Sequence, residues 1–305
     1  MPRETSVPVA GPFHWERSLV RPREQAAQDV HVGQGGEAIW ESVVTTMGGD
    51  RVGVTVMGCP KAIRVRSTAS DAARHDAVVR HVAWRLAVEG NGDAIYARLE
   101  ADPWMGPLAA RWWGIRPMRD ASPWVALARL ILGQQVSVAS HRTLVNRLLA
   151  RWGYPTLTPS GSRVAAWPAP EVLAAQTVDG LVAGGIPRRP AATLKRVARW
   201  AADGGLVGSP AEVVRGLETI HGVGPWTTAG LRLFGWGDDD AVMASDLVLR
   251  SAAARVAQAA EPFTARELAR WLEPYQPYRG WVSYLLWHER LEAGGTPAES
   301  GGVRS

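Results

Sequence analysis

A glycine-rich turn and an aspartate downstream of it are the residues of this chain best suited to chemistry. The turn reads Gly222-Val223-Gly224-Pro225-Trp226, and Asp246 follows twenty residues after Trp226. Because glycine leaves the backbone N–H groups bare, such a turn can hold a phosphate. A single carboxylate downstream can then act on the molecule that carries the phosphate. Taken alone, a Gly-x-Gly turn is more typical of an ordinary corner between two helices.

Short helices must position both features. Ser209-Pro210-Ala211-Glu212 is a capping box with proline at the first helical position, which predicts a helix over 210–220. The two glycines end this helix, and Pro225 pre-sets φ for a second helix over 225–235. Asp246 stands where the next helical pattern begins, so it is also well placed as a helix cap. Capping and a chemical role are compatible.

The remaining patterns divide the chain into a strand-rich part and a helical part. Segments 38–44 and 52–57 are β-rich, and Gly48-Gly49-Asp50 between them is typical of a hairpin turn. Apolar and basic residues alternate over 62–66. From Ser122 onward the pattern is helical throughout. The predicted helices are 71–89, 93–100, 104–113, 123–132, 137–151, 170–183, 187–203, 210–220, 225–235, 246–258, 264–273 and 279–293.

Composition limits the classes of function. The chain has 305 residues, a net charge of +5 and only two lysines, so arginine supplies nearly all of its positive charge. Arginine binds phosphate oxygens in a bidentate way, which suits a nucleic-acid partner, although genomic base composition explains the bias equally well. Cys59 is the single cysteine, which excludes an internal disulfide and a thiolate metal cluster. With no signal segment and no apolar run of about 18 residues, we expect a cytoplasmic protein without a membrane partner.

Three motifs, taken in their order, resemble one family. They are the turn with Asp246, the stretch Leu130-Ile131-Leu132-Gly133-Gln134-Gln135-Val136-Ser137, and Pro277-Tyr278-Arg279-Gly280-Trp281 running to Trp287. Together they resemble the helix-hairpin-helix DNA glycosylase superfamily, and within it the DNA-3-methyladenine glycosylase II group. The resemblance covers roughly residues 115 to 292. It implies an α+β, mainly α fold with four parts: a tail (1–10), a subdomain with an antiparallel sheet and helices (11–115), an all-helical glycosylase domain (116–295) and a tail (296–305).

The resemblance also implies the reaction. Asp246 is the expected catalytic carboxylate, which stabilises an oxocarbenium-like transition state as the N-glycosidic bond breaks. Trp226 and Trp287 match aromatic positions of the base pocket, where indole faces attract cationic methylated purines; buried core is the alternative for both. Branches that also cut the strand carry a lysine where Trp226 stands, so we expect hydrolysis without lyase activity. Gly230 and Leu247 stand where the best-known member has aromatic residues, which predicts a pocket that is roomier or that stacks less on the base.

Further residues are expected to contact DNA. Gln135 matches the wedge that enters the minor groove, with a plain loop residue as the alternative. Ser137 is expected to cap a helix or contact phosphate, and Arg279 to contact phosphate or form an ion pair. The Gly222 and Gly224 amides and Thr227 are expected beside a phosphate. A structural monovalent cation is expected on the backbone carbonyls of Glu218, Ile220 and Val223, with no other cofactor and no iron–sulfur cluster.

The sequence thus favours a monomeric, monofunctional glycosylase that removes alkylated purines, of the 3-methyladenine and 7-methylguanine type, from duplex DNA in base excision repair. Two alternatives remain open. One is a mismatch or deaminated-base glycosylase for uracil or hypoxanthine on the same scaffold. The other is a non-catalytic protein that binds DNA or senses alkylation.

Overall fold

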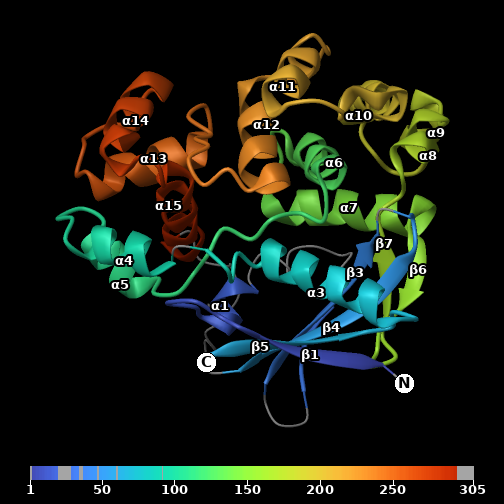
Figure 1. Cartoon of the computed structure of the whole chain (residues 1–305). Helices are drawn as coiled ribbons and strands as arrows, with labels where there is room; N and C mark the ends of the chain where they lie inside the picture. Colours follow the sequence, from blue (N-terminus) through green and yellow to red (C-terminus); the bar gives the residue numbers. More distant parts are fainter. Residues whose placement is uncertain are drawn as a thin grey trace, which may run out of the picture.

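A computed structural model describes residues 2–19, 29–33, 37–46, 48–59, 61–90 and 92–293. It joins a five-stranded sheet to a larger assembly of helices, with the sheet below and the helices above it in Figure 1. The expected tail at 296–305 lies outside the described residues. The predicted α+β, mainly α fold is confirmed. The sheet part and the helical part each have a hydrophobic core of their own.

The sheet is antiparallel throughout, in the order β1-β5-β4-β3-β2. The predicted hairpin is confirmed, because β3 pairs with β4 across the turn at Gly48 and Gly49. Helix α3 (Ala72–Arg85) packs on the sheet, where its Val78 and Val82 share a buried core with Val54, Val56 and Val65 of the strands. The strands are β1 (Arg3–Pro8), β2 (Asp29–Val32), β3 (Ala38–Thr45), β4 (Arg51–Cys59) and β5 (Ala62–Ser67).

The expected tail over residues 1–10 is wrong where it covers Arg3–Pro8. This segment is strand β1 and pairs with β5 from Arg3 opposite Ser67 to Pro8 opposite Ala62. The side chain of Thr5 also bonds to His75 of α3, with 2.9 Å between Oγ1 and Nε2. The strand pairing joins residues 54 to 64 positions apart in sequence, and the Thr5–His75 contact joins residues 70 apart. The local composition of a short polar segment therefore did not reveal them.

The helical part is organised around α6 (Pro123–Gly133), whose residues from Trp124 to Leu132 are all buried. The predicted helices are present, with the 170–183 pattern divided into α8 and α9. Several of the later helices are short. They are α7 (Val138–Trp152), α8 (Pro170–Ala174), α9 (Val178–Ala183), α10 (Arg188–Trp200), η1 (Ala201–Gly205), α11 (Pro210–Glu218), α12 (Pro225–Gly230), η2 (Leu231–Trp236), α13 (Leu247–Val256), α14 (Ala265–Leu272), η3 (Glu273–Tyr275) and α15 (Arg279–Ala293).

Helices α4 (Gly92–Glu100) and α5 (Gly106–Arg111) were expected in the sheet subdomain, because its predicted boundary is residue 115, but they pack with the helical part. Their buried side chains belong to the core of the helical part, not to that of the sheet. Tyr96 of α4 meets Trp281 of α15 edge-on, with ring centroids 6.4 Å apart. Arg111 of α5 forms an ion pair with Glu289 of α15 at 3.0 Å. By packing, the sheet subdomain ends before α4.

The helical part also contains a β-hairpin that the sequence patterns did not indicate. Strands β6 (Tyr154–Leu157) and β7 (Arg163–Ala166) pair antiparallel, and Val164 and Ala166 pack on Val43 of β3. The approach is close at Gly53 of β4, where a Cβ would lie 2.0 Å from the carbonyl oxygen of Leu157. The hairpin therefore braces the helical part against the sheet.

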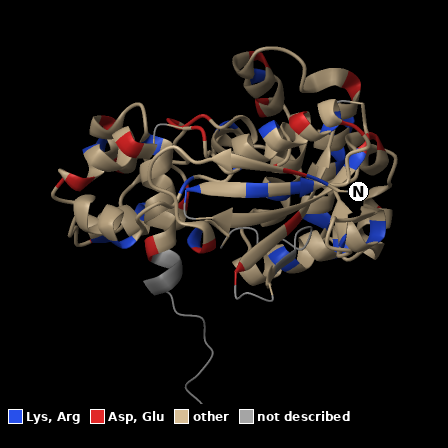
Figure 2. Ribbon diagram, turned by 60° about the horizontal axis from the view of Figure 1, so that its bottom comes forward, with Lys and Arg blue, Asp and Glu red and all other residues tan. Residues whose placement is uncertain are grey.

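Charges of both signs are interspersed over the molecule, and several basic positions follow the strands of the sheet (Figure 2). Within the described residues, no helix combines the length and the apolar character that a membrane crossing needs.

Candidate functional site

The glycine turn joins α11 to α12, and its two glycines are needed for different reasons. Gly222 has φ of +96°, and a Cβ there would lie 2.3 Å from Oγ1 of Thr193. Its bare backbone is thus a requirement of the fold. Gly224 is extended, with φ of −135° and ψ of −179°, and a Cβ there would meet no atom within 4 Å. The open space beside Gly224 is available to a ligand.

The turn between α6 and α7 is tied to this hairpin through Gln134, which the sequence reasoning missed. Gln134 donates from Nε2 to the carbonyl oxygen of Gly222 at 2.9 Å and to Oγ1 of Thr227 at 3.1 Å. Thr227 is 1% exposed, so its hydroxyl braces the hairpin from inside. Thr227 also lines the groove described below, and its expected place beside a phosphate stays a prediction. Two adjacent glutamines gave no signal as to which one points inward.

Gln135 is exposed and stands in the left-handed backbone region, with φ of +56°. Its Oε1 accepts a hydrogen bond from Nη1 of Arg189 at 3.4 Å. Ser137 caps α7 by accepting from the backbone N–H of Ser140 at 3.2 Å. Gln135 is therefore free to project from the turn, whereas Ser137 has the capping role that was one of its two expected roles.

Asp246, Trp226 and Trp287 come together, although they lie on three elements. The carboxylate of Asp246 caps α13, because its Oδ1 accepts from the backbone N–H of Leu249 at 2.7 Å. Nε1 of Trp226 donates to Oδ2 at 2.8 Å, and Nε1 of Trp287 donates to Oδ1 at 3.2 Å. Three donors thus fix the carboxylate in one orientation, which a preorganised electrostatic site requires.

These residues stand at an apolar pocket of about 250 Å³. Its outer wall includes Val136, Val138 and Val248, which are 38%, 44% and 44% exposed. One side is an aromatic stack, in which Phe234 lies 5.8 Å from Trp287 between ring centroids, at 24° between planes. Three polar residues of the lining are buried: Arg129, Tyr284 and His288. A pocket of this size suits a single small ring system, since pockets for drug-sized ligands measure roughly 300–1,000 Å³.

Gly230 does not widen this pocket as expected. A Cβ there would lie 2.7 Å from Cδ2 of Leu130 and 3.1 Å from Cε of Met243. Both of these side chains line the pocket. The space that an aromatic residue would take is therefore filled by aliphatic neighbours.

A groove of about 580 Å³ runs past the mouth of the pocket. The α6–α7 turn, the glycine hairpin and the loop before α13 form its walls. Trp226, Asp246 and Val248 line both the groove and the pocket. An extended polymer in the groove would therefore present one side group to the pocket.

Arg279 forms an ion pair, which was one of its two expected roles. Its Nε donates to Oδ1 of Asp240 at 2.8 Å, and its Nη2 donates to Oδ2. Burial alone would raise the pKa of Asp240, but the hydrogen bonds from Arg279 outweigh burial and hold the pKa below its usual value. This pair fixes the start of α15, the helix that carries Trp287.

The carbonyls expected to hold a monovalent cation belong to the glycine turn and its flanks. The carbonyl of Ile220 accepts from the backbone N–H of Val223 at 3.0 Å. Carbonyl oxygens suit hard cations, so the donor type fits, and the cation stays a prediction. Among the residues described, no group of three or more His, Cys, Asp or Glu side chains is arranged to hold a metal ion.

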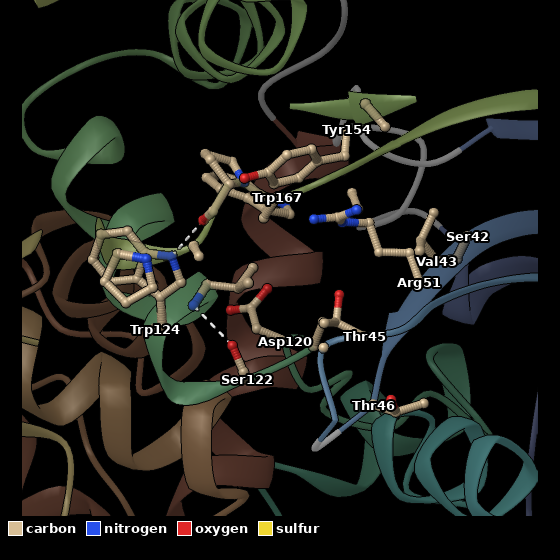
Figure 3. Close-up of a pocket in the computed structure, with 18 of the residues that line it drawn as sticks. Ser42, Val43, Thr45, Thr46, Arg51, Asp120, Ser122, Trp124, Tyr154 and Trp167 are labelled. Carbon is tan, nitrogen blue, oxygen red and sulfur yellow. Dashed lines mark hydrogen bonds between the residues drawn. The ribbon is translucent and has the colours of Figure 1, made fainter. Parts of the chain in front are cut away.

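A second cavity, of about 380 Å³, lies where the sheet, the β6–β7 hairpin and the start of α6 meet. Figure 3 shows Asp120, Thr45 and Arg51 around it, below Tyr154 and Trp167. It shares no lining residue with the pocket at Asp246.

No protein-family model matches the chain. The chain is 32% identical over 206 residues to the probable bifunctional transcriptional activator/DNA repair enzyme AlkA of Mycobacterium tuberculosis, covering 66% of the chain and 40% of that protein. It is 28% identical over 164 residues to DNA-3-methyladenine glycosylase 2 of Escherichia coli, covering 52% of the chain and 55% of that protein. The chain thus spans about half or less of these relatives.

Solved structures share the fold. The 3-methyladenine DNA-glycosylase from Archaeoglobus fulgidus has a TM-score of 0.82 at 21% identity, over 96% of this chain and 100% of that one. The 8-oxoguanine glycosylase/lyase of Clostridium acetobutylicum, solved with double-stranded DNA, has a TM-score of 0.73 at 15% identity, over 96% of this chain and 98% of that one.

Proposed function

We propose a base-excision function for this chain, since it belongs to the helix-hairpin-helix DNA glycosylase superfamily and, within it, to the DNA-3-methyladenine glycosylase II group. The proposed reaction is hydrolysis of the N-glycosidic bond of alkylated purines in duplex DNA. The observation that carries the proposal is the carboxylate of Asp246, held by two indole N–H groups at the mouth of an apolar pocket.

The geometry suits the chemistry of base flipping. A flipped nucleotide can place its base in the pocket while its sugar stays at the mouth, beside Asp246. As the glycosidic bond breaks, positive charge develops on the sugar, and a fixed carboxylate stabilises it without reorganising. The base leaves with the bonding electrons, and a water supplies the new oxygen at the sugar carbon. The product is an abasic site on an intact strand.

Alkylated purines are the proposed substrates because of what lines the pocket. Purines methylated at N3 or N7 carry positive charge while they remain attached to the sugar. The indole of Trp287 and the ring of Phe234 present π surfaces beside the pocket, which attract such a cation. A normal base gains only stacking area from the same rings. The glycosidic bonds of the cationic bases are also weaker, which adds to the discrimination.

Hydrolysis without strand cleavage is proposed because no motif amine is present. Trp226 stands in the hairpin position where lyase branches carry a lysine. Of the two lysines in the chain, Lys61 lies in the turn directly before β5. Lys195 lies on α10, where its Nζ donates to the carbonyl of Gln176 at 2.7 Å. Neither lines the pocket or the groove.

Duplex DNA is the proposed partner, and the groove is its proposed site. A Cβ at Gly224 would meet open space, and the exposed Gln135 and the positively charged Arg189 line the same groove. Phosphate contacts of this kind position a duplex without reading its sequence. We propose that Gln135 fills the space that the flipped nucleotide leaves.

The test is release of free bases from methylated duplex DNA by the purified chain, measured by chromatography. The proposal predicts release of 3-methyladenine and 7-methylguanine, with strands that break only after alkali is added. A uracil-containing and a hypoxanthine-containing duplex serve as comparison substrates. Release of uracil with no release of methylated purines would overturn the assignment, and binding without any release would indicate a non-catalytic protein.

A further inference from the structure

We infer that Arg129 makes the pocket select purines with a carbonyl oxygen, rather than an amino group, on the edge farthest from the sugar. The inference rests on the proposed function, because it concerns the base that enters the same pocket. It assigns a role to a buried cation that the reaction at Asp246 does not use.

Arg129 lines the pocket from α6 and is 8% exposed, next to Asp120, which is 1% exposed. Its Nε donates to Oδ1 of Asp120 at 2.9 Å, and its Nη2 donates to Oδ2 at 3.3 Å. These bonds use two of the five N–H groups of the guanidinium. Among the residues that the structure describes, Arg129 has no other hydrogen-bond partner, so its Nη1 group remains for a ligand.

The ion pair supplies hydrogen-bond donors without net charge. The carboxylate of Asp120 balances the positive charge of the Arg129 guanidinium through a bidentate contact. The Cζ atom of Arg129 lies 5.9 Å from the ring centroid of Phe234. The backbone N–H of Asp120 donates to the carbonyl of Phe234 at 2.8 Å, which fixes the pair to the aromatic wall. A cationic base is therefore not repelled by a net positive charge. Arg129 instead contributes a directed N–H donor to the pocket.

The position of Asp246 sets which edge of the base meets that donor. The sugar must lie beside Asp246 at the mouth, so the opposite edge of the purine points into the pocket, toward the buried part of its lining, which includes Arg129. In guanine and hypoxanthine this edge carries the O6 acceptor, and in adenine it carries the N6 amino donor. A guanidinium N–H bonds to the oxygen but opposes the amino group, and a buried donor left unpaired penalises the wrong base.

The test compares 7-methylguanine and 3-methyladenine released from one sample of methylated duplex DNA under single-turnover conditions. Both bases are cationic while attached. They differ in the methyl position, in the amino group at C2 and in the group at C6, and only the group at C6 lies on the edge that we expect to meet Arg129. The double variant Arg129→Gln/Asp120→Asn removes both charges together, because removing one partner would leave the other buried and unpaired. The rate ratio of the two bases, taken within each variant, does not depend on the fraction of active protein.

We expect the double variant to lower the ratio of 7-methylguanine to 3-methyladenine release by about tenfold or more, because loss of a specific buried donor removes this kind of discrimination. Arg129→Lys, which keeps the charge beside Asp120 but loses the fork, should lower the ratio by a smaller factor and serves if the double variant does not fold. The control is Arg74→Gln/Asp71→Asn, an exposed ion pair on the sheet subdomain, which should change neither rate.

An unchanged ratio in Arg129→Lys and in the folded double variant would overturn the inference, even if both rates fell. Equal loss of both bases would mean that the ion pair only supports the pocket wall. Failure of the unmodified chain to release either base would refute the proposed function itself. The two failures are thus distinguishable.

Discussion

The two glycines of the hairpin give opposite results on substitution, although they lie two residues apart. Gly224→Ala places a methyl group in open space on an extended backbone, so the fold accepts it. Such a substitution stabilises a protein by about 0.4–1 kcal/mol through the unfolded state. Gly222→Ala instead places Cβ 2.3 Å from Oγ1 of Thr193 at φ of +96°. We expect it to lower the free energy of unfolding by roughly 1–3 kcal/mol for the backbone alone.

DNA binding by Gly224→Ala should nevertheless fall. The methyl group would occupy the open space in which we propose that the phosphate lies, and a hydrogen bond to a charged group is worth about 1.5–3 kcal/mol. This corresponds to binding weaker by roughly 10- to 100-fold. The plot of the logarithm of the binding constant against the logarithm of the salt concentration should become shallower by about 0.9, since one phosphate contact is removed.

The assay is fluorescence anisotropy with undamaged and methylated duplexes over a range of salt concentrations, together with thermal melting of each variant. Gly48→Ala, in the open hairpin turn of the sheet, is the control and should bind as the unmodified chain does. Unweakened binding by a fully folded Gly224→Ala would refute the phosphate contact. Weakening for methylated duplexes alone would assign the hairpin to the base pocket.

Three further predictions concern the pocket, the reaction and the ion pair that anchors α15. Trp287→Ala should reduce the release rate of a cationic base roughly twofold to thirtyfold more than that of a neutral base, because only the cationic base loses about 0.5–2 kcal/mol of cation–π energy. Equal reductions for both bases, with a lowered melting temperature, would show that Trp287 is only a core residue. Borohydride should trap no covalent adduct with DNA, and a trapped band would contradict hydrolysis. Asp240 has a lowered pKa in the folded chain, so it stabilises the fold above its usual pKa and loses this effect as the pH falls through the folded value. Asp240→Asn should therefore lower the free energy of unfolding by roughly 1–3 kcal/mol at neutral pH. In urea titrations at a series of pH values, the variant should also lose less stability than the unmodified chain as the pH falls. An unchanged dependence of stability on pH would show that the Arg279–Asp240 ion pair does not stabilise the fold.

The helices were predictable because their signals are local. Capping boxes at Ser209 and Thr264, which the structure contains, mark where α11 and α14 begin, and apolar spacing marks their buried faces. Strand β1 and the β6–β7 hairpin were not predictable in the same way. Their hydrogen bonds and packing partners are distant in sequence, and strand preference depends on such neighbours.

The site shows the same division. Spacing and resemblance selected Asp246, Trp226 and Trp287, which meet through two hydrogen bonds. Neither could show that Gln134 points inward while Gln135 points outward, because that depends on the backbone at the turn. The Arg129–Asp120 ion pair could not be predicted from the sequence either, because the residue types alone do not show which charged side chains meet.

We propose that the charge of Asp246 drives excision, and the variant Asp246→Asn removes this charge while it keeps the shape of the side chain. Asparagine caps a helix as well as aspartate does, so α13 should keep its start and the fold should be retained. We expect single-turnover release of 7-methylguanine to fall by at least about 100-fold, as when one preorganised electrostatic group is lost, while binding to the same duplex stays close to that of the unmodified chain. Release by Asp246→Asn at a rate near that of the unmodified chain would show that the charge of Asp246 does not drive the reaction.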